Sequence, residues 1–225
     1  MSEHLCPSVH GEAAFSLAER LWSLNRSISG EGLRETLRIL QEFVPELELI
    51  EIPTGTRAFD WTVPEEWAVG EAWIADENGH RIVDFADNNL HLVGYSTGVD
   101  RIMSLDELQP HLHSLPDQPD AIPYVTSYYE RNWGFCLSQN QRDALEPGSY
   151  RTRIDARHFE GSITLAEAVF PGETDEEIFF STYCCHPSMA NNELSGPCVA
   201  TALARRRRTR LGIRPCRPCR PRCRA

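Results

Sequence analysis

The densest group of residues that could do chemistry lies between positions 185 and 196, in the order Cys-His-Pro-Ser-Met-Ala-Asn-Asn-Glu-Leu-Ser-Gly. An imidazole nitrogen of His186 can bind a metal ion, and a side-chain oxygen from the loop that follows can approach the same ion. The same spacing also fits a structural role, in which His186 is hydrogen-bonded to the loop and the two Asn residues cap the next helix. Spacing alone leaves both interpretations open.

The elements on either side of this loop are predicted to hold it at the end of a strand. Residues 177–185 are almost continuously apolar, which is typical of a central strand covered on both faces. Ser195 is expected to cap a helix that runs to about Ala204, with Pro197 near its first turn. A strand, a polar loop and a helix in this order form the unit in which α/β proteins bind ligands.

The rest of the chain predicts two helices and a strand, followed by a β-rich unit. Apolar residues recur at helical spacing in residues 12–24 and 33–44, and residues 47–52 have the composition of a strand. Short aromatic and β-branched runs then predict further strands, at 61–63, 72–74, 81–83 and 91–93.

Three local patterns predict how these elements are connected. Asn78-Gly79 predicts a hairpin turn, because both residues tolerate positive φ. Ser104 with Glu107 three residues later predicts a helix that begins with a capping box. Residues 150–157 and 162–170 are predicted to form another hairpin around residues 160–161.

The composition is that of an ordinary globular protein. Of the 225 residues, 41% are hydrophobic, and 22 basic and 33 acidic side chains give a formal charge of 22 − 33 = −11. Disordered, collagen-like and membrane-spanning classes are excluded. The N-terminus has no basic region followed by an apolar stretch, so we expect a cytoplasmic location, reduced thiols and no membrane partner.

The C-terminal 21 residues differ from the rest of the chain. Residues 205–225 contain ten of the 22 basic side chains and no acid, so residues 1–204 carry 12 − 33 = −21. No Lys occurs in the chain, and Arg, Pro, Ala and Cys dominate when GC-rich DNA is translated out of frame. We therefore expect a frameshifted or truncated copy, with residues 205–225 as a disordered, out-of-frame tail.

Two other functions of this tail fit its sequence less well. An Arg-rich segment can bind nucleic acid, and Cys216, Cys219 and Cys223 can supply three zinc thiolates. The tail has no aromatic residue to stack on bases, and the fourth metal ligand is missing. We expect no nucleic-acid partner.

The segment from His186 to Gly196 resembles the first metal-ligand segment of the zinc-dependent exopeptidases of the aminopeptidase superfamily, in which a strand-end His is followed by Asp-Asn-x-Ser-Gly. A closer resemblance is to bacterial aminopeptidase-like proteins of the DUF2172 and DUF4910 type, which include polysaccharide biosynthesis proteins with an aminopeptidase-like domain. It covers residues 13–204 and rests on further motifs at 59–67, 89–96, 128–136 and 181–196.

The resemblance implies an α/β fold. The chain would contain the N-terminal part of a zinc-exopeptidase-like (phosphorylase/hydrolase-like) core, interrupted by an inserted β-rich domain and incomplete at the C-terminus. The first core segment is expected at residues 12–56 and the inserted domain at 57–147. The chain is then expected to return to the core, with the metal-ligand motif, at 148–204, and the basic tail follows at 205–225.

The resemblance also implies zinc as the cofactor, with His186 as the first ligand. Asn192 matches the position of the metal-bridging Asp, but its amide oxygen lacks the charge of a carboxylate. Glu193 is expected to compensate, as a further ligand or as loop support. Ser188 stands where many relatives have an Asp that orients the His. No catalytic residue is assigned, because in the superfamily the general base and the other ligands come later in the sequence.

The expected function is that of an aminopeptidase-like zinc metallohydrolase whose substrate, a small peptide or a glycan-related molecule, is unknown. We expect this chain itself to be inactive, because it lacks most of the ligands and the general base. A non-catalytic peptide- or glycan-binding module built on a peptidase-like fold is the alternative. The sequence does not predict the oligomeric state.

Overall fold

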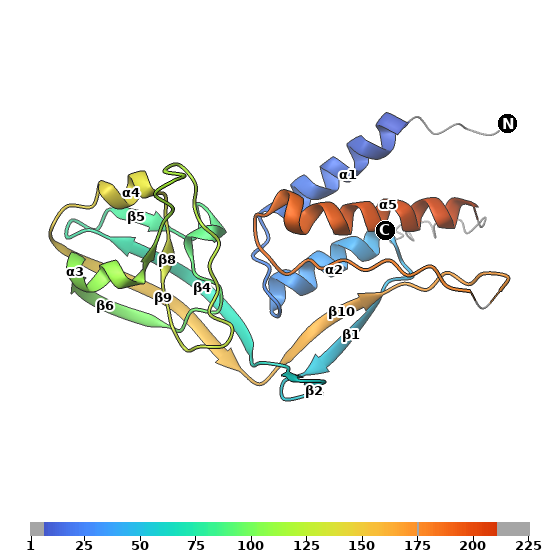
Figure 1. Cartoon of the computed structure of the whole chain (residues 1–225), viewed down its shortest axis with the longest axis horizontal. Helices are drawn as coiled ribbons and strands as arrows, with labels where there is room; N and C mark the ends of the chain where they lie inside the picture. Colours follow the sequence, from blue (N-terminus) through green and yellow to red (C-terminus); the bar gives the residue numbers. More distant parts are fainter. Residues whose placement is uncertain (1–6, 175, 211–225) are drawn as a thin grey trace, which may run out of the picture.

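The computed structural model describes residues 7–174 and 176–210, which form two units (Figure 1). A helical unit holds both ends of the described chain. A β unit is inserted between the two strands of the helical unit, and only strands β4 and β9 run from one unit to the other. This mixed helix and strand architecture confirms the α/β class expected from the sequence.

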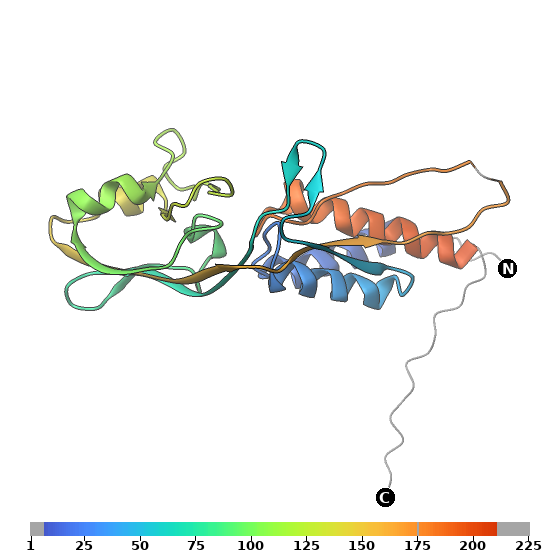
Figure 2. The same cartoon turned by 90° about the horizontal axis from the view of Figure 1, so that it is seen from below.

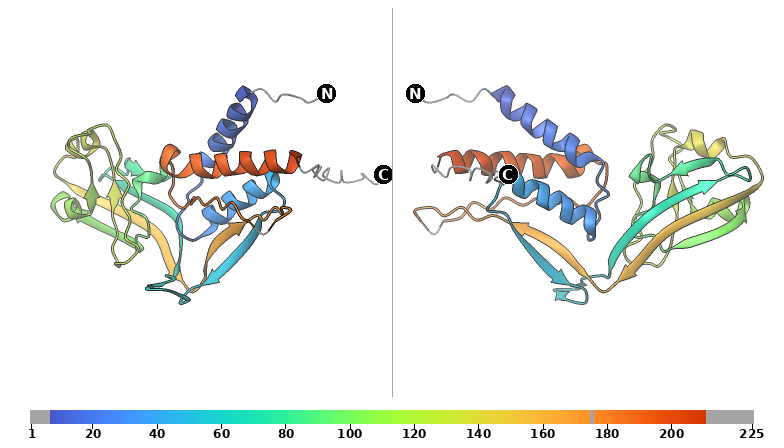
Figure 3. Two further views of the ribbon diagram at one scale, coloured as in Figure 1. Left: turned by 45° about the vertical axis from the view of Figure 1, so that its right-hand side comes forward. Right: turned by 180° about the vertical axis from the view of Figure 1, so that it is seen from behind.

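The helical unit consists of three long helices and a two-stranded antiparallel sheet (Figure 3). Helix α2 covers one face of this sheet, and α5 packs against α1 and α2. The predicted helices at 12–24 and 33–44 and the strand at 47–52 are confirmed. The elements are α1 (Pro7–Trp22), α2 (Glu31–Phe43), β1 (Glu48–Pro53), β10 (Ser162–Glu167), a π-helical turn (Ala190–Leu194) and α5 (Ser195–Arg210).

The β unit is built on an antiparallel sheet with the strand order β5-β4-β9-β6. This sheet curves beneath the short helices α3 and α4 (Figure 2). Its strands are β4 (Glu66–Ala75), β5 (Arg81–Asp84), β6 (Val99–Ser104) and β9 (Ser149–Phe159). Its smaller elements are the 3₁₀ turns Asn89–His91 and Gln109–His111, α3 (Leu105–Leu108), β7 (Leu112–His113), β8 (Phe135–Cys136) and α4 (Gln139–Asp143). A separate hairpin, β2 (Arg57–Ala58) and β3 (Trp61–Thr62), follows β1 at the junction of the two units (Figure 1).

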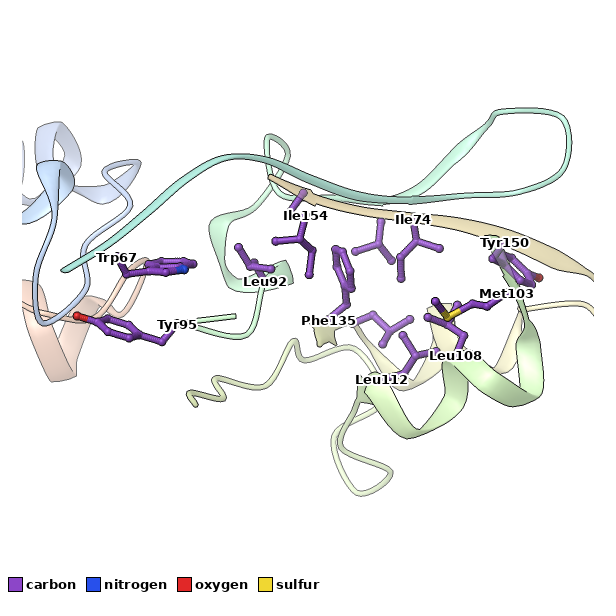
Figure 4. Close-up of a cluster of buried hydrophobic side chains, with 13 residues drawn as sticks. Trp67, Ile74, Leu92, Tyr95, Met103, Leu108, Leu112, Phe135, Tyr150 and Ile154 are labelled. Carbon is purple, nitrogen blue, oxygen red and sulfur yellow. The ribbon is translucent and has the colours of Figure 1, made fainter. Parts of the chain in front are cut away.

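The core of the β unit lies between this sheet and the segments that cover it (Figure 4). Phe135 is fully buried at its centre, between Ile74 and Ile154 of the sheet and Leu108 of α3. Two local predictions are confirmed here. Residues 78–79 turn the chain between β4 and β5, and the capping box at the start of α3 has both of its hydrogen bonds.

The two units meet where the loop before α2 touches the start of β4. The Ser29 hydroxyl is 2.6 Å from the Tyr95 hydroxyl and accepts a hydrogen bond from the N–H of Trp67. The Trp67 and Tyr95 rings stack with centroids 5.6 Å apart. Gly30 has φ +97°, and a Cβ there would lie 2.8 Å from the carbonyl oxygen of Trp67, so this close approach requires glycine.

The expected central strand at 177–185 is wrong: this segment has no regular secondary structure. Ile178, Phe179 and Phe180 are 85%, 83% and 67% exposed. A strand needs a partner for its backbone N–H and C=O groups, and no described strand pairs with this segment. The apolar composition is therefore present without the pairing that would make it a strand.

The expected hairpin around residues 160–161 is also wrong. Strand β9 pairs with β4 and β6 in the β unit, whereas β10 pairs with β1 in the helical unit. Residues 160–161 are thus a crossing point between the units, where the buried Glu66 carboxylate accepts the N–H of Ser162. Residues 149–159 lie in the β unit, although the sequence places 148–204 in the core.

Two smaller expectations also differ from the structure. Residues 89–91 form a 3₁₀ turn and not the start of a strand, with His91 buried and its Nδ1 2.7 Å from the Cys136 carbonyl oxygen. Residues 205–210 continue α5, so this part of the expected disordered tail is helical. Residues 211–225 lie outside the described residues.

We expect Phe135→Ala to lower the free energy of unfolding by about 3–5 kcal/mol, because it leaves a cavity at the centre of the β unit. Urea unfolding followed by circular dichroism measures this loss. Phe59→Ala is the matched control, since Phe59 is 97% exposed and its truncation removes no packing. Equal losses for the two variants would contradict this account of the core.

Candidate metal-binding site

The candidate site is formed by His186 and the π-helical turn that follows it. The turn brings two side chains back to the imidazole: the Asn192 Oδ1 atom is 3.3 Å from Nδ1 of His186, and the Glu193 Oε1 atom is 2.6 Å from the same nitrogen. The π turn directly precedes α5, which begins at Ser195 as the sequence predicts. Ser195 is not the expected N-cap, because it already has helical φ and ψ and donates its hydroxyl to the carbonyl oxygen of Asn191.

Glu193 is the fully buried member of this group. Its Oε2 atom accepts the backbone N–H of Cys185 at 3.0 Å, and its Oε1 atom lies 3.8 Å from the Cys185 sulfur. Burial raises the pKa of Glu193, and nearby His186 opposes this rise. Burial also raises the pKa of the Cys185 thiol, to about 12. A carboxylate removed from water in this way favours a cation beside it.

Arg26, in the loop between α1 and α2, holds the segment that carries His186. It is only 1% exposed, and its Nε donates to the carbonyl oxygen of His186 at 3.1 Å. A second nitrogen donates to the carbonyl oxygen of Leu21, and Nη2 has no hydrogen-bond partner within the described residues. Burial lowers the pKa of Arg26, which the nearby Glu193 charge opposes.

The β unit forms the other side of the site. The Tyr124 ring lies 4.5 Å from the His186 ring, between centroids, and its hydroxyl is 3.0 Å from the hydroxyl of Tyr128. Burial raises the pKa of both tyrosines, so both hydroxyls keep their protons. Asn89 accepts a hydrogen bond from Ser188. The site therefore lies between the two units.

The structure brings together three of the four residues singled out in the sequence. His186, Asn192 and Glu193 are mutual neighbours, whereas Ser188 has φ +46° and turns its hydroxyl toward the β unit. Sequence reasoning did not assign Cys185 to the site, although it directly precedes His186. Arg26 and Tyr124 carry no local sequence signal, and only the fold shows their contribution.

The donor atoms of the site suit zinc. One ligand atom each from Cys185, His186 and Glu193 lie within 4.8 Å of one another, and no other cluster of three His, Cys, Asp or Glu donors occurs in the part of the chain that the structure describes. Zinc prefers these donor types, at about 2.0–2.3 Å and in tetrahedral geometry. The His186 Nδ1 and Glu193 Oε1 atoms are 2.6 Å apart, which is an ion pair when His186 is protonated, and a metal ion held by both groups replaces this contact.

The β unit corresponds to a known sequence family. Residues 66–157 match the model of a domain of unknown function, DUF2172. The match begins at the first residue of β4 and ends near the last residue of β9. Tyr124 and Asn89, which contact the metal-type cluster or its loop, lie within the region that matches this model.

A curated protein and a crystal structure, both from Clostridium acetobutylicum, are similar to most of the chain. A polysaccharide biosynthesis protein with an aminopeptidase-like domain, as its name describes it, is 45% identical over 195 residues, which are 87% of this chain and 45% of that protein. A crystal structure of a protein named as a candidate peptidase has a TM-score of 0.86 and 45% identity, over 88% of this chain and 47% of that chain. The chain is thus a relative of aminopeptidase-like proteins, and it spans about half the length of these two.

None of the helices in residues 7–174 and 176–210 combines the length and the apolar composition that crossing a membrane requires.

We expect Arg26→Met to lower the free energy of unfolding by about 2–3 kcal/mol, because two carbonyl oxygens lose their buried donor. Methionine keeps most of the side-chain volume, so the loss measures the polar contacts. Arg20→Met is the control: Arg20 forms a partly exposed ion pair with Glu42, worth about 1 kcal/mol or less. Urea unfolding measures the loss of unfolding free energy in both variants. Similar unfolding midpoints for Arg26→Met and Arg20→Met would contradict the role given to Arg26.

Proposed function

We propose that the chain carries the first metal-ligand segment of an aminopeptidase-like zinc metallohydrolase. The observation that supports this proposal is the convergence of Cys185, His186 and Glu193 donor atoms within 4.8 Å, in a relative of aminopeptidase-like proteins. His186 and Asn192 are the proposed metal ligands. Glu193 is a further ligand or holds the His186 ring, and Ser188 supports the loop through Asn89.

Four residues around His186 each have a part in the proposed site. A zinc ion supplies a Lewis acid that polarises a carbonyl group and lowers the pKa of a bound water molecule. Glu193 fixes the orientation of the imidazole through Nδ1, and Arg26 fixes the backbone of His186. Tyr124 covers one side of the imidazole ring and keeps water from it. Asn192 adds a neutral oxygen, so the negative charge of the cluster comes from Glu193.

We further propose that the 225-residue chain does not hydrolyse peptides by itself. The described metal-type cluster contains one carboxylate, Glu193, whose Oε2 atom accepts the Cys185 N–H and whose Oε1 atom lies 2.6 Å from Nδ1 of His186. That carboxylate is therefore not free to accept a proton from a water molecule. Substrates are expected to be small peptides or glycan-related molecules, and the name of the Clostridium acetobutylicum relative supports this range.

We expect the chain to bind one zinc or cobalt ion and His186→Ala to abolish this binding. Cobalt is the better probe, because tetrahedral coordination by the cluster gives a visible absorption band. The measurement uses a background in which Cys216, Cys219 and Cys223 are replaced by Ser, so that these thiols do not contribute. His80→Ala is the matched control, since the His80 side chain is 81% exposed and far from the cluster in sequence.

Two results would contradict this metal site. One is the absence of stoichiometric binding in the Ser background, and the other is equal binding by His186→Ala and His80→Ala. Calorimetry gives the stoichiometry independently of the cobalt spectrum.

We expect no hydrolysis of a panel of aminoacyl amides by the purified chain, with or without added zinc. The physical reason is that its cluster lacks a free general base. Rates are compared with those of the Clostridium acetobutylicum relative under the same conditions. Hydrolysis by the chain that disappears when a chelator is added would overturn this expectation.

A further inference from the structure

A small cavity of about 90 Å³ opens at the surface of the β unit. Four aromatic side chains line it: Tyr95, Tyr128, Tyr129 and His158. Clefts that bind drug-sized molecules measure about 300–1,000 Å³. This cavity is smaller than that range, so it accepts one chemical group of a few heavy atoms, while the rest of a larger ligand stays outside.

The aromatic rings of the cavity stand at steep angles to one another. The Tyr95 and Tyr128 rings have centroids 5.0 Å apart and planes at 81°, and the Tyr128 and Tyr129 rings have centroids 6.5 Å apart and planes at 82°. The His158 ring lies 5.7 Å from the Tyr95 ring, at 60°. Rings that line one cavity at such angles surround it from different sides. This is the arrangement of the aromatic cages that bind organic cations.

The Tyr95 ring is fixed in this position by its own contacts. Its other ring neighbour is Trp67, which stacks on it with centroids 5.6 Å apart (Figure 4). The backbone of Tyr95 has φ +64°, a left-handed conformation that is unfavourable for a residue other than glycine. Strained backbone of this kind is found at ligand sites, where it presents a side chain in a defined direction. The cage is therefore formed before a ligand enters.

The tyrosine hydroxyls of the cavity already have hydrogen-bond partners. The Tyr95 hydroxyl is 2.6 Å from the Ser29 hydroxyl, and the Tyr128 hydroxyl is 3.0 Å from the Tyr124 hydroxyl. A primary ammonium group carries three N–H donors and needs acceptors for them, whereas a quaternary ammonium group carries none. A lining of aromatic rings with occupied hydroxyls therefore suits the quaternary group.

The charge of the lining also favours a cation. Two carboxylates, Glu65 and Glu130, and one guanidinium, Arg131, give the lining a formal charge of 1 − 2 = −1. Arg131 forms an ion pair with Glu65, so the negative charge that remains is that of Glu130. Burial and the nearby Arg131 charge lower the pKa of His158, so this ring is neutral at pH 7 and does not repel a cation.

We propose that this cavity binds a quaternary ammonium group, held by cation–π contacts with Tyr95, Tyr128 and Tyr129. The Glu130 carboxylate adds electrostatic attraction from the rim. The site does not depend on the proposed metal site, because none of the residues that line the cavity belongs to the cluster of Cys185, His186 and Glu193. Binding is therefore measured in the presence of a chelator, so that the two proposals fail or succeed separately.

The test titrates the full 225-residue chain by calorimetry with three probes that share a hydroxyethyl tail. These are choline, its neutral isostere in which a carbon atom replaces the nitrogen, and ethanolamine. We expect choline to bind one-to-one and about tenfold or more tightly than either of the other two. The isostere has the same shape without the charge, and ethanolamine has the charge but loses hydration of its three N–H groups that the rings do not replace.

A fourth probe distinguishes two sources of the group. A short peptide with one trimethyllysine carries the same quaternary ammonium group on a side chain. Binding of choline or of this peptide, with the unmethylated peptide binding about tenfold or more weakly, supports the proposal. The tighter of the two identifies whether a small molecule or a polypeptide carries the group.

A pair of variants at Tyr129 tests the cage. Tyr129 is 82% exposed, so its substitution removes little packing, and circular dichroism checks that the fold is intact. Tyr129→Ala is expected to weaken binding of choline or of the trimethylated peptide by about fivefold or more, because one cation–π contact is lost. Tyr129→Phe is the matched control and is expected to keep the affinity, since it retains the ring and removes only the hydroxyl.

Three results would overturn the proposal. The first is that neither choline nor the trimethylated peptide binds. The second is equal binding of choline and its neutral isostere, or of choline and ethanolamine, because the cavity would then not select a quaternary cation. The third is an affinity that Tyr129→Ala leaves unchanged.

Discussion

Two buried ionisable side chains, Glu193 and Arg26, determine where the candidate site lies. Within residues 7–174 and 176–210, no strand pairs with the segment that carries His186, so no sheet hydrogen bonds from this part of the chain hold it. Its position depends on Arg26, which binds the His186 carbonyl oxygen, and on Glu193, which binds the His186 ring and the Cys185 N–H. Both groups are removed from water, where polar contacts are stronger and an unpaired group is costly. The same burial that fixes the loop holds the Glu193 carboxyl group beside the His186 ring.

The β unit contributes to this site and is more than a separate module. Strands β4 and β9 connect it to the helical unit, and Ser29, Trp67 and Tyr95 pack at the junction. This arrangement brings Tyr124 of the β unit against the His186 ring. Residues of both units therefore surround the His186 cluster.

Local sequence signals predicted local structure well. The turn at 78–79 and the capping box of Ser104 each depend on a few neighbouring residues, and both are confirmed. Predictions that needed a distant partner were wrong. The segments flanking residues 160–161 joined different sheets, and the apolar run at 177–185 formed no strand. Strand identity depends on pairing with chain that is remote in sequence, and alternation or apolarity alone does not specify that partner.

The sequence by itself determined the grouping of His186, Asn192 and Glu193, because they lie within eight residues and one helical turn can bring them together. Only the tertiary structure decided what surrounds them. Arg26 is 160 positions away from His186, and Ser188 contacts Asn89 across 99 positions. Such contacts arise because buried polar groups need hydrogen-bond partners, and the fold supplies these partners from distant segments. Neither segment alone carries a sequence pattern that predicts the contact.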